Sequence, residues 1–282
     1  MISRRNVLSG FAGLAAPVLS GCGSRQQQAA APPISYAYAQ PVPVPDSRAA
    51  AGLDAVIDVS HMVAVGDFTA VRRSNILGVI HKVSEGGDYF DQSYAARRPQ
   101  AESAGLLWGA YHFGTRQYSG QQQAAAFLSA ARPGPKTLLA LDLEPNDLNP
   151  RNTMTLAQAE AFVLTVHHAT GRLPLVYTHP TWANGGRYGR AGLRLGQPIS
   201  PGSVLARCDL WLADYREEPE VPRAWADRGW RLWQYLANES ADDAAYGAVP
   251  RAVSGVDRCD RNLFAGSVAQ LYQFWAGRAG ST

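Results

Sequence analysis

The chain has 282 residues, of which 46% are hydrophobic and 17% charged, and its formal net charge at pH 7 is +3. This length and composition are typical of one large globular domain or two small ones. Lys and Arg are scattered along the chain, which argues against nucleic acid as a partner, because nucleic-acid binding needs a clustered basic surface. Few candidate ligands are grouped together in the sequence, so we expect neither a metal nor a cofactor.

The first 22 residues are expected to form an export signal rather than part of the fold. Arg4 and Arg5 precede an apolar stretch that is too short to span a bilayer comfortably, and small residues follow it. The stretch LSGC at 19–22 resembles the end of a bacterial lipoprotein signal, in which the cysteine, here Cys22, receives a lipid. An ordinary secretory signal with a chance cysteine is the alternative, and the arginine pair weakly resembles a twin-arginine signal. A lipid on Cys22 would tether the protein in the cell envelope, where we expect the periplasmic face of the outer membrane.

Residues 23–51 are rich in Gln, Ala and Pro and show no apolar period, which predicts a flexible or partly extended linker. The folded domain is then expected over residues 52–282. In it, short apolar runs alternate with helical patterns. The expected strands are 55–58, 78–81, 107–112, 137–142, 174–177, 210–213 and 230–234, and the expected helices are 68–73, 92–104, 120–131 and 156–170.

The expected strands are nearly continuously apolar, which suits a parallel sheet that is buried on both faces. No Gly-x-Gly-x-x-Gly sequence follows any of them, so a dinucleotide-binding sheet has no support. The helical signal fades after Trp182. We therefore predict an α/β fold, an irregular TIM-like barrel that starts as repeated β-α units and closes with strands alone.

Cys208 and Cys259 are the two cysteines that remain if Cys22 carries a lipid. In an oxidising compartment we expect them to form a disulfide. In the chain-entropy model, closing a loop of roughly 50 residues contributes on the order of 4 kcal/mol. Two buried free thiols are the alternative.

Acidic and aromatic side chains gather at the C-terminal ends of the expected strands, where barrels of this kind build their active sites. Asp142 and Glu144 follow the most strand-like run and are two positions apart, so both would face the barrel mouth if the strand continues. Two close carboxyl groups are what glycoside hydrolysis requires, because the charge of one raises the pKa of the other. An ion pair with Lys82 or Arg207 is the alternative. The other candidates are Asp58, Lys82, Glu85, Tyr111, Tyr177, Asp214, Tyr215, Trp233 and Gln234, whose aromatic members suit sugar rings.

Eight short motifs in this order resemble the family 25 glycoside hydrolases, which are lysozymes (N-acetylmuramidases) that cut peptidoglycan. The resemblance runs from about residue 52 to residue 266. The motifs are Asp-Val-Ser (58–60), Lys-x-x-Glu-Gly (82–86), Gly-Ala-Tyr-His-Phe (109–113), Asp-x-Glu (142–144), Tyr-Thr (177–178), Leu-Trp-x-Ala-x-Tyr (210–215), Trp-Gln-Tyr (233–235) and Asp-Arg-Asn-x-Phe (260–264).

The resemblance implies five β-α units closed by three further strands, and a monomer that acts on peptidoglycan glycan strands. It implies that Glu144 is the proton donor and that Asp142 stabilises positive charge or orients the 2-acetamido group. Asp58 and Asp260 would complete the acidic cluster, and the match to Asp-x-Asn-x-Phe favours Asp260 over Asp257. Both retention and inversion are compatible with two carboxylates at this spacing, and the resemblance favours retention.

Two features depart from the family pattern. Many members carry a tryptophan soon after the first Asp-Val-Ser, whereas this chain has His61 and Met62. The Arg- and Gly-rich stretch 185–194 matches no motif, and we expect a surface loop near the groove. Two other functions remain: a non-catalytic peptidoglycan-binding lipoprotein, and a chitinase. Retention of all four acids argues against the first, and Ala140, where a chitinase would carry an aspartate, argues against the second.

Overall fold

The structure is a computed structural model and describes residues 52–216, 218–237 and 252–277. The expected signal with Cys22 and the expected linker, residues 1–51, lie outside the described residues. Within the described parts, no helix is long and apolar enough to cross a membrane.

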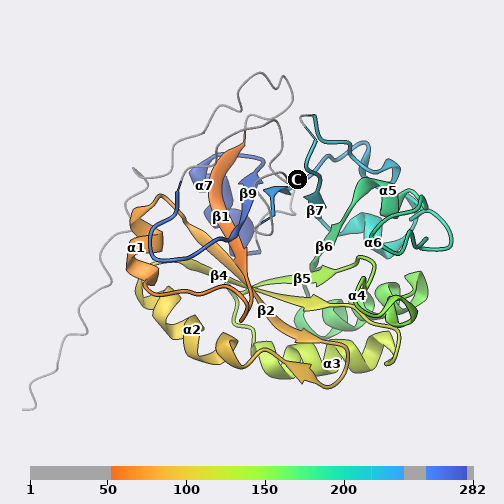
Figure 1. Cartoon of the computed structure of the whole chain (residues 1–282), viewed down its shortest axis with the longest axis horizontal. Coiled ribbons are helices and arrows are strands. Elements are labelled where there is room, and N and C mark those ends of the chain that lie inside the picture. Colours follow the sequence, from red (N-terminus) through yellow and green to blue (C-terminus); the bar gives the residue numbers. More distant parts are fainter. Residues whose placement is uncertain (1–51, 217, 238–251, 278–282) are drawn as a thin grey trace, which may run out of the picture. The chain divides into compact units, whose positions relative to one another are not determined.

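Eight strands form a closed barrel in the order β1-β2-β4-β5-β6-β7-β8-β9, and β9 pairs back onto β1 (Figure 1). Consecutive strands from β1 to β8 run parallel, whereas β9 runs antiparallel to both β8 and β1. A short strand, β3, adds antiparallel to the end of β2. The strands are β1 Leu53–Val59, β2 Gly78–Glu85, β3 Tyr89–Phe90, β4 Leu107–Phe113, β5 Leu138–Asp142, β6 Leu175–Thr178, β7 Leu210–Ala213, β8 Leu232–Leu236 and β9 Asp260–Phe264.

Helices follow each of the first five barrel strands and lie around the outside of the barrel (Figure 1). They are α1 Phe68–Arg73, α2 Gln92–Ser103, α3 Gly120–Ala131, α4 Leu156–Thr170, and the short pair α5 Pro180–Ala183 and α6 Val204–Arg207. In the described residues, β7 is followed only by the 3-10 turn η3, Arg223–Trp225. The predicted fold, an irregular barrel of five β-α units and three closing strands, is therefore confirmed.

Local sequence explains why α3 and α4 begin where they do. Ser119 and Gln122 form a capping box at the start of α3, and Thr155 and Gln158 form another at the start of α4. In each pair the side chains satisfy backbone N–H groups that the helix itself leaves unpaired. Gly171 ends α4 with a φ of 70°, a left-handed conformation that glycine adopts without steric cost.

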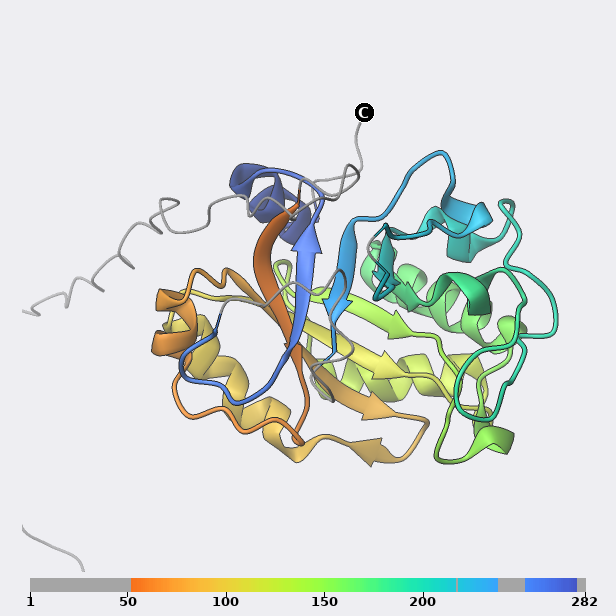
Figure 2. The ribbon, with the colours of Figure 1, turned by 45° about the horizontal axis from the view of Figure 1, so that its top comes forward.

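The last helix, α7 Val268–Trp275, closes the N-terminal end of the barrel, and Figure 2 shows it at the end of β9, which lies beside β1. Trp275 is buried and donates a hydrogen bond from Nε1 to the Trp108 backbone oxygen at 2.8 Å. A Cβ at Gly78 would lie 2.7 Å from the Trp275 ring, so glycine is needed for this close approach. The α7 side chains Leu271, Phe274 and Trp275 therefore join the core inside the barrel and cover part of its N-terminal end.

The expected disulfide between Cys208 and Cys259 is not formed. Both cysteines are buried free thiols. Cys208 precedes β7 at the N-terminal end of the parallel strands, whereas Cys259 precedes the antiparallel β9, which begins at their C-terminal end. The strand between them, β8, has five residues and spans about 16 Å. A disulfide needs Cα atoms within about 7 Å of each other, so the two thiols are too far apart along the barrel axis.

Candidate active site

A cavity of about 570 Å³ lies at the C-terminal ends of the barrel strands. It brings together nine of the residues expected from the sequence. Seven of them lie on seven different barrel strands, and Glu144 and Tyr215 lie just after β5 and β7. The nine residues are Asp58, Lys82, Tyr111, Asp142, Glu144, Tyr177, Tyr215, Gln234 and Asp260. The remaining lining residues are Ser60, His61, Met62, Phe113, Tyr188, Trp211 and Ala237.

Asp142 and Glu144 reach the cavity because the strand pattern continues past the end of β5. The Asp142 backbone oxygen accepts a hydrogen bond from Gly114 N at 3.0 Å, and Leu143 N donates to Tyr177 O at 3.0 Å. Leu143 faces the outer core and is fully buried, while the residues on either side of it line the cavity. The two-residue spacing therefore places both carboxyl groups on the same side of the chain, as predicted.

The electrostatic environment of Asp142 favours its protonated form. Burial and, second, the negative charge of Glu144 hold the pKa of the Asp142 carboxyl well above its usual range, although the charge of Lys82 opposes them. Its Oδ1 is buried and has no hydrogen-bond partner among the described residues. Two carboxyl groups coupled in this way titrate as a pair and retain a proton to higher pH than a lone aspartate does.

Gln234, on β8, connects the acids of the cavity to its aromatic side chains. Its Oε1 accepts hydrogen bonds from the hydroxyls of Tyr177 at 2.9 Å and Tyr215 at 2.6 Å. Its Nε2 donates to Asp58 Oδ2 at 3.1 Å and to Asp260 Oδ2 at 3.3 Å. One amide therefore fixes two phenols and two carboxylates, and the two hydroxyl donors determine which end of the amide faces which group.

Asn262 and Trp211 are site residues that sequence reasoning missed. Asn262 is fully buried on β9, and its Nδ2 donates to Asp58 Oδ2 at 2.7 Å. Trp211 lines the cavity from β7 and donates from Nε1 to Asn262 Oδ1 at 2.6 Å. Burial raises the pKa of Asp58, although the hydrogen bonds from Asn262 and Gln234 lower it. Both residues lie inside motifs quoted above. A side chain with a hydrogen-bonding group on a buried strand needs a buried partner, and this signal could have identified them in the sequence.

The 185–194 stretch forms a surface loop near the cavity, as expected, and it contributes a lining residue. Tyr188 and Leu193 pair through two backbone hydrogen bonds of 2.9 Å, which folds the loop back on itself. The Tyr188 ring stacks on the His179 ring, with centroids 3.9 Å apart and an interplanar angle of 12°. The loop therefore presents Tyr188 to the cavity, a role that the sequence did not reveal.

Three expected substrate-binding residues do not line the cavity. Trp233 is fully buried in the core outside the barrel, because it precedes Gln234 on β8 and neighbouring strand residues face opposite sides. Its Nε1 donates to the Asp214 backbone oxygen at 2.6 Å. The buried Asp214 carboxylate instead accepts bonds from Arg216 and from the Glu220 backbone N. Glu85 accepts a hydrogen bond of 2.8 Å from Lys82 Nζ. It therefore helps to position the lysine, which does line the cavity.

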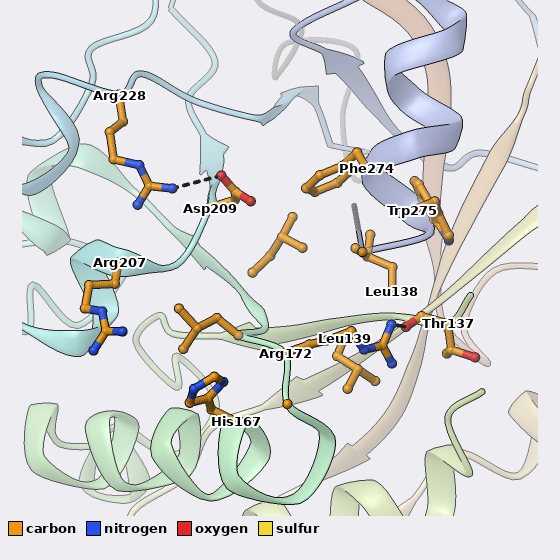
Figure 3. A pocket seen from close by; sticks show the side chains of 14 residues that line it. Thr137, Leu138, Leu139, His167, Arg172, Arg207, Asp209, Arg228, Phe274 and Trp275 are labelled. Carbon is orange, nitrogen blue, oxygen red and sulfur yellow. Dashed lines mark hydrogen bonds and ion pairs between the residues drawn. The ribbon is translucent and has the colours of Figure 1, made fainter. Parts of the chain in front are cut away.

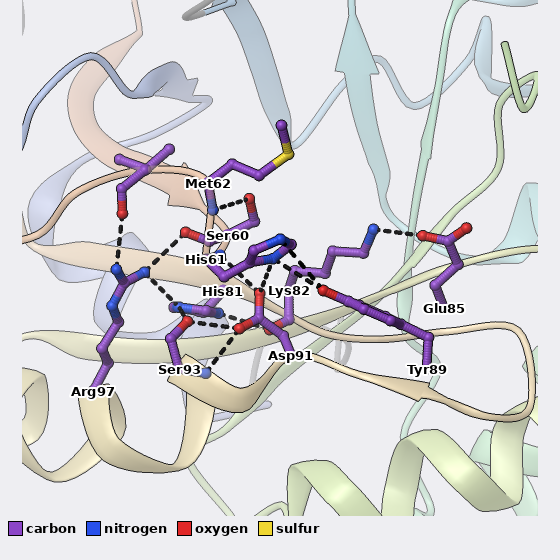
Figure 4. A network of polar contacts seen from close by, with 11 residues as sticks. Ser60, His61, Met62, His81, Lys82, Glu85, Tyr89, Asp91, Ser93 and Arg97 are labelled. Atoms are coloured by element: carbon purple, nitrogen blue, oxygen red, sulfur yellow. Dashed lines mark hydrogen bonds and ion pairs between the residues drawn. The ribbon is translucent and has the colours of Figure 1, made fainter. Parts of the chain in front are cut away.

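The loop 60–63, here called the rim loop, carries His61 and Met62 at the edge of the cavity (Figure 4). The fully buried Asp91 carboxylate accepts from His61 N at 2.8 Å and contacts His61 Nδ1 at 3.2 Å. Arg97, on α2, donates to the backbone oxygens of Ser60 and Val63, both at 2.8 Å. The rim loop is thus held at three backbone positions by the α2 region.

Comparisons with known proteins agree with this geometry. Residues 57–244 match Glycosyl hydrolases family 25. Lysozyme M1 of Streptomyces globisporus is 29% identical over 232 residues, which cover 76% of this chain and 69% of that protein. The bacterial lysozyme of Streptomyces coelicolor superposes with a TM-score of 0.64 at 28% identity, covering 79% of this chain and 97% of that one. A family GH25 lysozyme of Aspergillus fumigatus gives a TM-score of 0.60 at 27% identity, covering 78% and 97% of the two chains. Because the family match extends over more than half of the sequence, this chain belongs to family 25 of the glycosyl hydrolases and is a glycoside hydrolase.

Proposed function

We propose that the protein is a peptidoglycan hydrolase, an N-acetylmuramidase that cleaves the β-1,4 bond between N-acetylmuramic acid and N-acetylglucosamine. The observation that carries the proposal is the placement of Asp142 and Glu144 in the wall of one cavity, with Asp58 and Asp260 also lining it. Glycoside hydrolysis needs one protonated carboxyl group and a second, charged one. The similarity to lysozymes and a muramidase supports peptidoglycan as the substrate.

Glu144 is the general acid in this proposal, and substrate binding delivers the proton to it. In the free protein, burial and the charge of Glu144 raise the pKa of Asp142, so the two carboxyl groups together retain a proton to higher pH than a lone carboxyl group does. A bound 2-acetamido group can donate its N–H to the unpartnered Asp142 Oδ1. That hydrogen bond favours the charged form of Asp142 and lowers its pKa, so the proton passes to Glu144.

Bond cleavage then uses the two carboxyl groups in different roles. Glu144 protonates the glycosidic oxygen as it leaves, and the charged Asp142 stabilises the positive charge that develops on the sugar or holds its acetamido group. Asp58 and Asp260 are the further acids of the proposed site. Their hydrogen bonds to Gln234 fix their carboxylates before substrate arrives, which avoids reorganisation during the reaction.

The aromatic side chains of the cavity are proposed to bind the sugar rings. Tyr111, Tyr177 and Tyr215 line the cavity, and Trp211 contacts the first two edge-on, with centroid distances of 6.2 Å and 5.0 Å. Rings that support each other in this way present fixed faces to the apolar C–H faces of a sugar. Lys82 Nζ lies 5.1 Å from the centroid of the Phe113 ring and brings a positive charge to the cavity wall.

We further propose that the protein is exported, carries a lipid on Cys22 and acts as a monomer on the glycan strands of the envelope. The sequence of residues 1–22 supports the export and the lipid. The hydrolysis of peptidoglycan also requires a location outside the cytoplasm, where that polymer lies.

Mass spectrometry of the products from purified peptidoglycan tests the proposed activity. The chain and its Glu144→Gln variant are compared under the same conditions. New reducing N-acetylmuramic acid ends from the chain, reduced about 10²- to 10⁴-fold in the variant, are expected from loss of the general acid. A non-catalytic binding protein would instead sediment with the polymer and release nothing, and equal activity of both proteins would exclude Glu144 as the acid.

A further inference from the structure

A second cavity, of about 470 Å³, lies at the opposite, N-terminal end of the barrel (Figure 3). Its walls come from the segments that lead into β5, β6 and β7, from the end of α4 and from α7. Nothing in the proposed hydrolysis uses it, because the proposed catalytic groups lie at the other end of the strands.

The charged side chains that line this cavity are mainly arginines: Arg172, Arg207 and Arg228, with Asp209 the acidic residue among the lining positions. Arg172 donates to the backbone oxygens of Gly134, Pro135 and Thr137, and these bonds leave its positive charge uncancelled. Arg228 bonds to Asp209 at 3.1 Å, which offsets one charge. The cavity therefore keeps a net positive charge.

Arg207 is the arginine with capacity to bind a ligand. It is exposed at the end of α6, and no hydrogen bond or ion pair joins it to another residue in the described part of the chain. His167 also lines the cavity, on the same side of Figure 3 as Arg207, and its Nδ1 is buried without a hydrogen-bond partner among the described residues. A basic residue at a helix C-terminus also stabilises the helix dipole, so the charge of Arg207 alone would not indicate a ligand.

Apolar side chains form another wall of the same cavity. Leu138, Leu173, Leu175 and Phe274 line it, and Figure 3 shows Phe274 and Leu138 on the side away from Arg207 and Arg228. A site that combines guanidinium groups with an apolar wall suits a ligand that joins a phosphate to hydrocarbon. A free inorganic anion would not use the apolar wall.

The course of the chain indicates where such a ligand would come from. β1 begins at Leu53 and is parallel to β2, so the chain enters the barrel at the same end as this cavity. About 30 residues separate Leu53 from Cys22, and even a fully extended segment of that length reaches only about 100 Å. A lipid on Cys22 would therefore hold the domain within about 100 Å of a membrane, attached at the end of the barrel that carries this cavity.

We propose that the Arg207 cavity binds the phosphate headgroup of an anionic phospholipid, so that the N-terminal face of the barrel rests on a membrane. The catalytic cavity then opens away from the lipid and toward the glycan strands. The cavity argument is independent of the proposed hydrolysis, and only the argument from the chain's course uses the proposed lipid on Cys22.

Vesicle co-sedimentation tests this inference on the full chain with Cys22→Ala, which no lipid can anchor. Vesicles of equal parts phosphatidylglycerol and phosphatidylcholine are compared with vesicles of phosphatidylcholine alone. Arg207→Glu changes the charge of this residue by two units, and each unit of charge at an anionic surface changes the partition about fivefold. The variant is therefore expected to bind the anionic vesicles about 20-fold more weakly.

The matched control, Arg151→Glu, alters an exposed residue of the turn η2 Pro150–Asn152, between β5 and α4 at the opposite end of the barrel. It is expected to change binding less than about twofold, since it lies more than a Debye length from the membrane.

Three results would overturn the inference. They are equal binding to both vesicle types, equal weakening by the two arginine variants, and complete displacement from vesicles by inorganic phosphate at matched ionic strength. The last would indicate a site for free phosphate rather than for a headgroup. Peptidoglycan hydrolysis, measured on the same preparations, is expected to be unchanged by Arg207→Glu. A chain that binds anionic vesicles through Arg207 but releases no muropeptides would contradict the proposed function and support this inference.

Discussion

Gln234 and Asp58 lie 176 positions apart in the sequence, yet the Gln234 Nε2 contacts both carboxylate oxygens of Asp58, at 3.3 Å and 3.1 Å. Their strands, β8 and β1, are not neighbours, because β9 lies between them. Asn262 on β9 pairs in register with Gln234 and donates to the same carboxylate. The mouth of the barrel is therefore connected by side chains across three strands.

Gln234→Leu should weaken both the fold and the reaction. It removes the acceptor of the Tyr177 hydroxyl and one of the donors to the Asp58 carboxylate, which then keeps the bond from Asn262. Each such loss costs about 1–3 kcal/mol. We expect a free energy of unfolding lower by about 2–4 kcal/mol and a kcat at least about tenfold lower. Denaturant unfolding and the rate of muropeptide release check the two effects. Tyr215→Phe, which removes one donor and leaves the amide, should cost less on both measures.

Asp142→Asn should stabilise the protein at neutral pH. A carboxyl group whose pKa is higher in the folded state stabilises the fold fully below its unfolded pKa of about 3.9. That contribution is lost as the pH rises from the unfolded value through the raised folded value, so the Asp142 carboxyl group is a cost to the fold at neutral pH. We expect a gain of about 1 kcal/mol for the variant at neutral pH, and the gain should vanish as the pH falls toward 4. Thermal unfolding across this range is the measurement, with the exposed Asp227→Asn as a control that should show no such trend.

Arg97→Ala should loosen the rim loop and weaken substrate binding. Arg97 donates to two backbone oxygens of that loop, whereas the adjacent Arg98 donates to the backbone oxygens of Ala131 and Arg132 at the end of α3. Charged hydrogen bonds of this kind contribute about 1.5–3 kcal/mol. We expect a KM raised about fivefold or more with a smaller change in kcat, because the loop lines the cavity and carries no proposed catalytic group. If Arg98→Ala raised KM equally, the effect would come from α2 as a whole and not from the rim loop.

The two cysteines of the barrel should behave as free, unreactive thiols. Burial raises the pKa of the Cys208 and Cys259 thiols to about 12, so the reactive thiolate is scarce at neutral pH. In the chain with Cys22→Ala, a thiol reagent should label neither residue in the native state and both in denaturant. Reducing agent should leave the thermal unfolding temperature unchanged. A lower unfolding temperature in reducing agent would reveal a disulfide between them, which the separation of the two residues along the barrel axis excludes.

The sequence was sufficient for those parts of the fold that local interactions determine. The capping box at Thr155 fixes the start of α4, and the spacing of Asp142 and Glu144 fixes their common side, because both depend on neighbours within a few residues. The Trp233 prediction could have been corrected by the same two-residue alternation, since Gln234 faces the cavity.

Other features depend on contacts between distant strands, which local pattern does not encode. β9 contains Asp260, Arg261 and Asn262, so it lacks the apolar run of the other strands. These polar residues are accommodated because Arg261 pairs with Asp54 on the neighbouring strand β1, and Asn262 bonds to Asp58 and Trp211. The separation of Cys208 from Cys259 has the same origin, because it follows from the reversed direction of β9.

The pairing of β1 with β9 also affects when the hydrolase becomes active as the chain is made. Leu53 lies opposite Phe264, so the first and the last barrel strands must meet before the acidic cluster is complete. A chain that has emerged only as far as β8 lacks both Asp260 and the Asn262 amide that holds Asp58. On the proposed mechanism, a nascent chain is therefore expected to stay inactive until β9 has emerged and docked between β8 and β1.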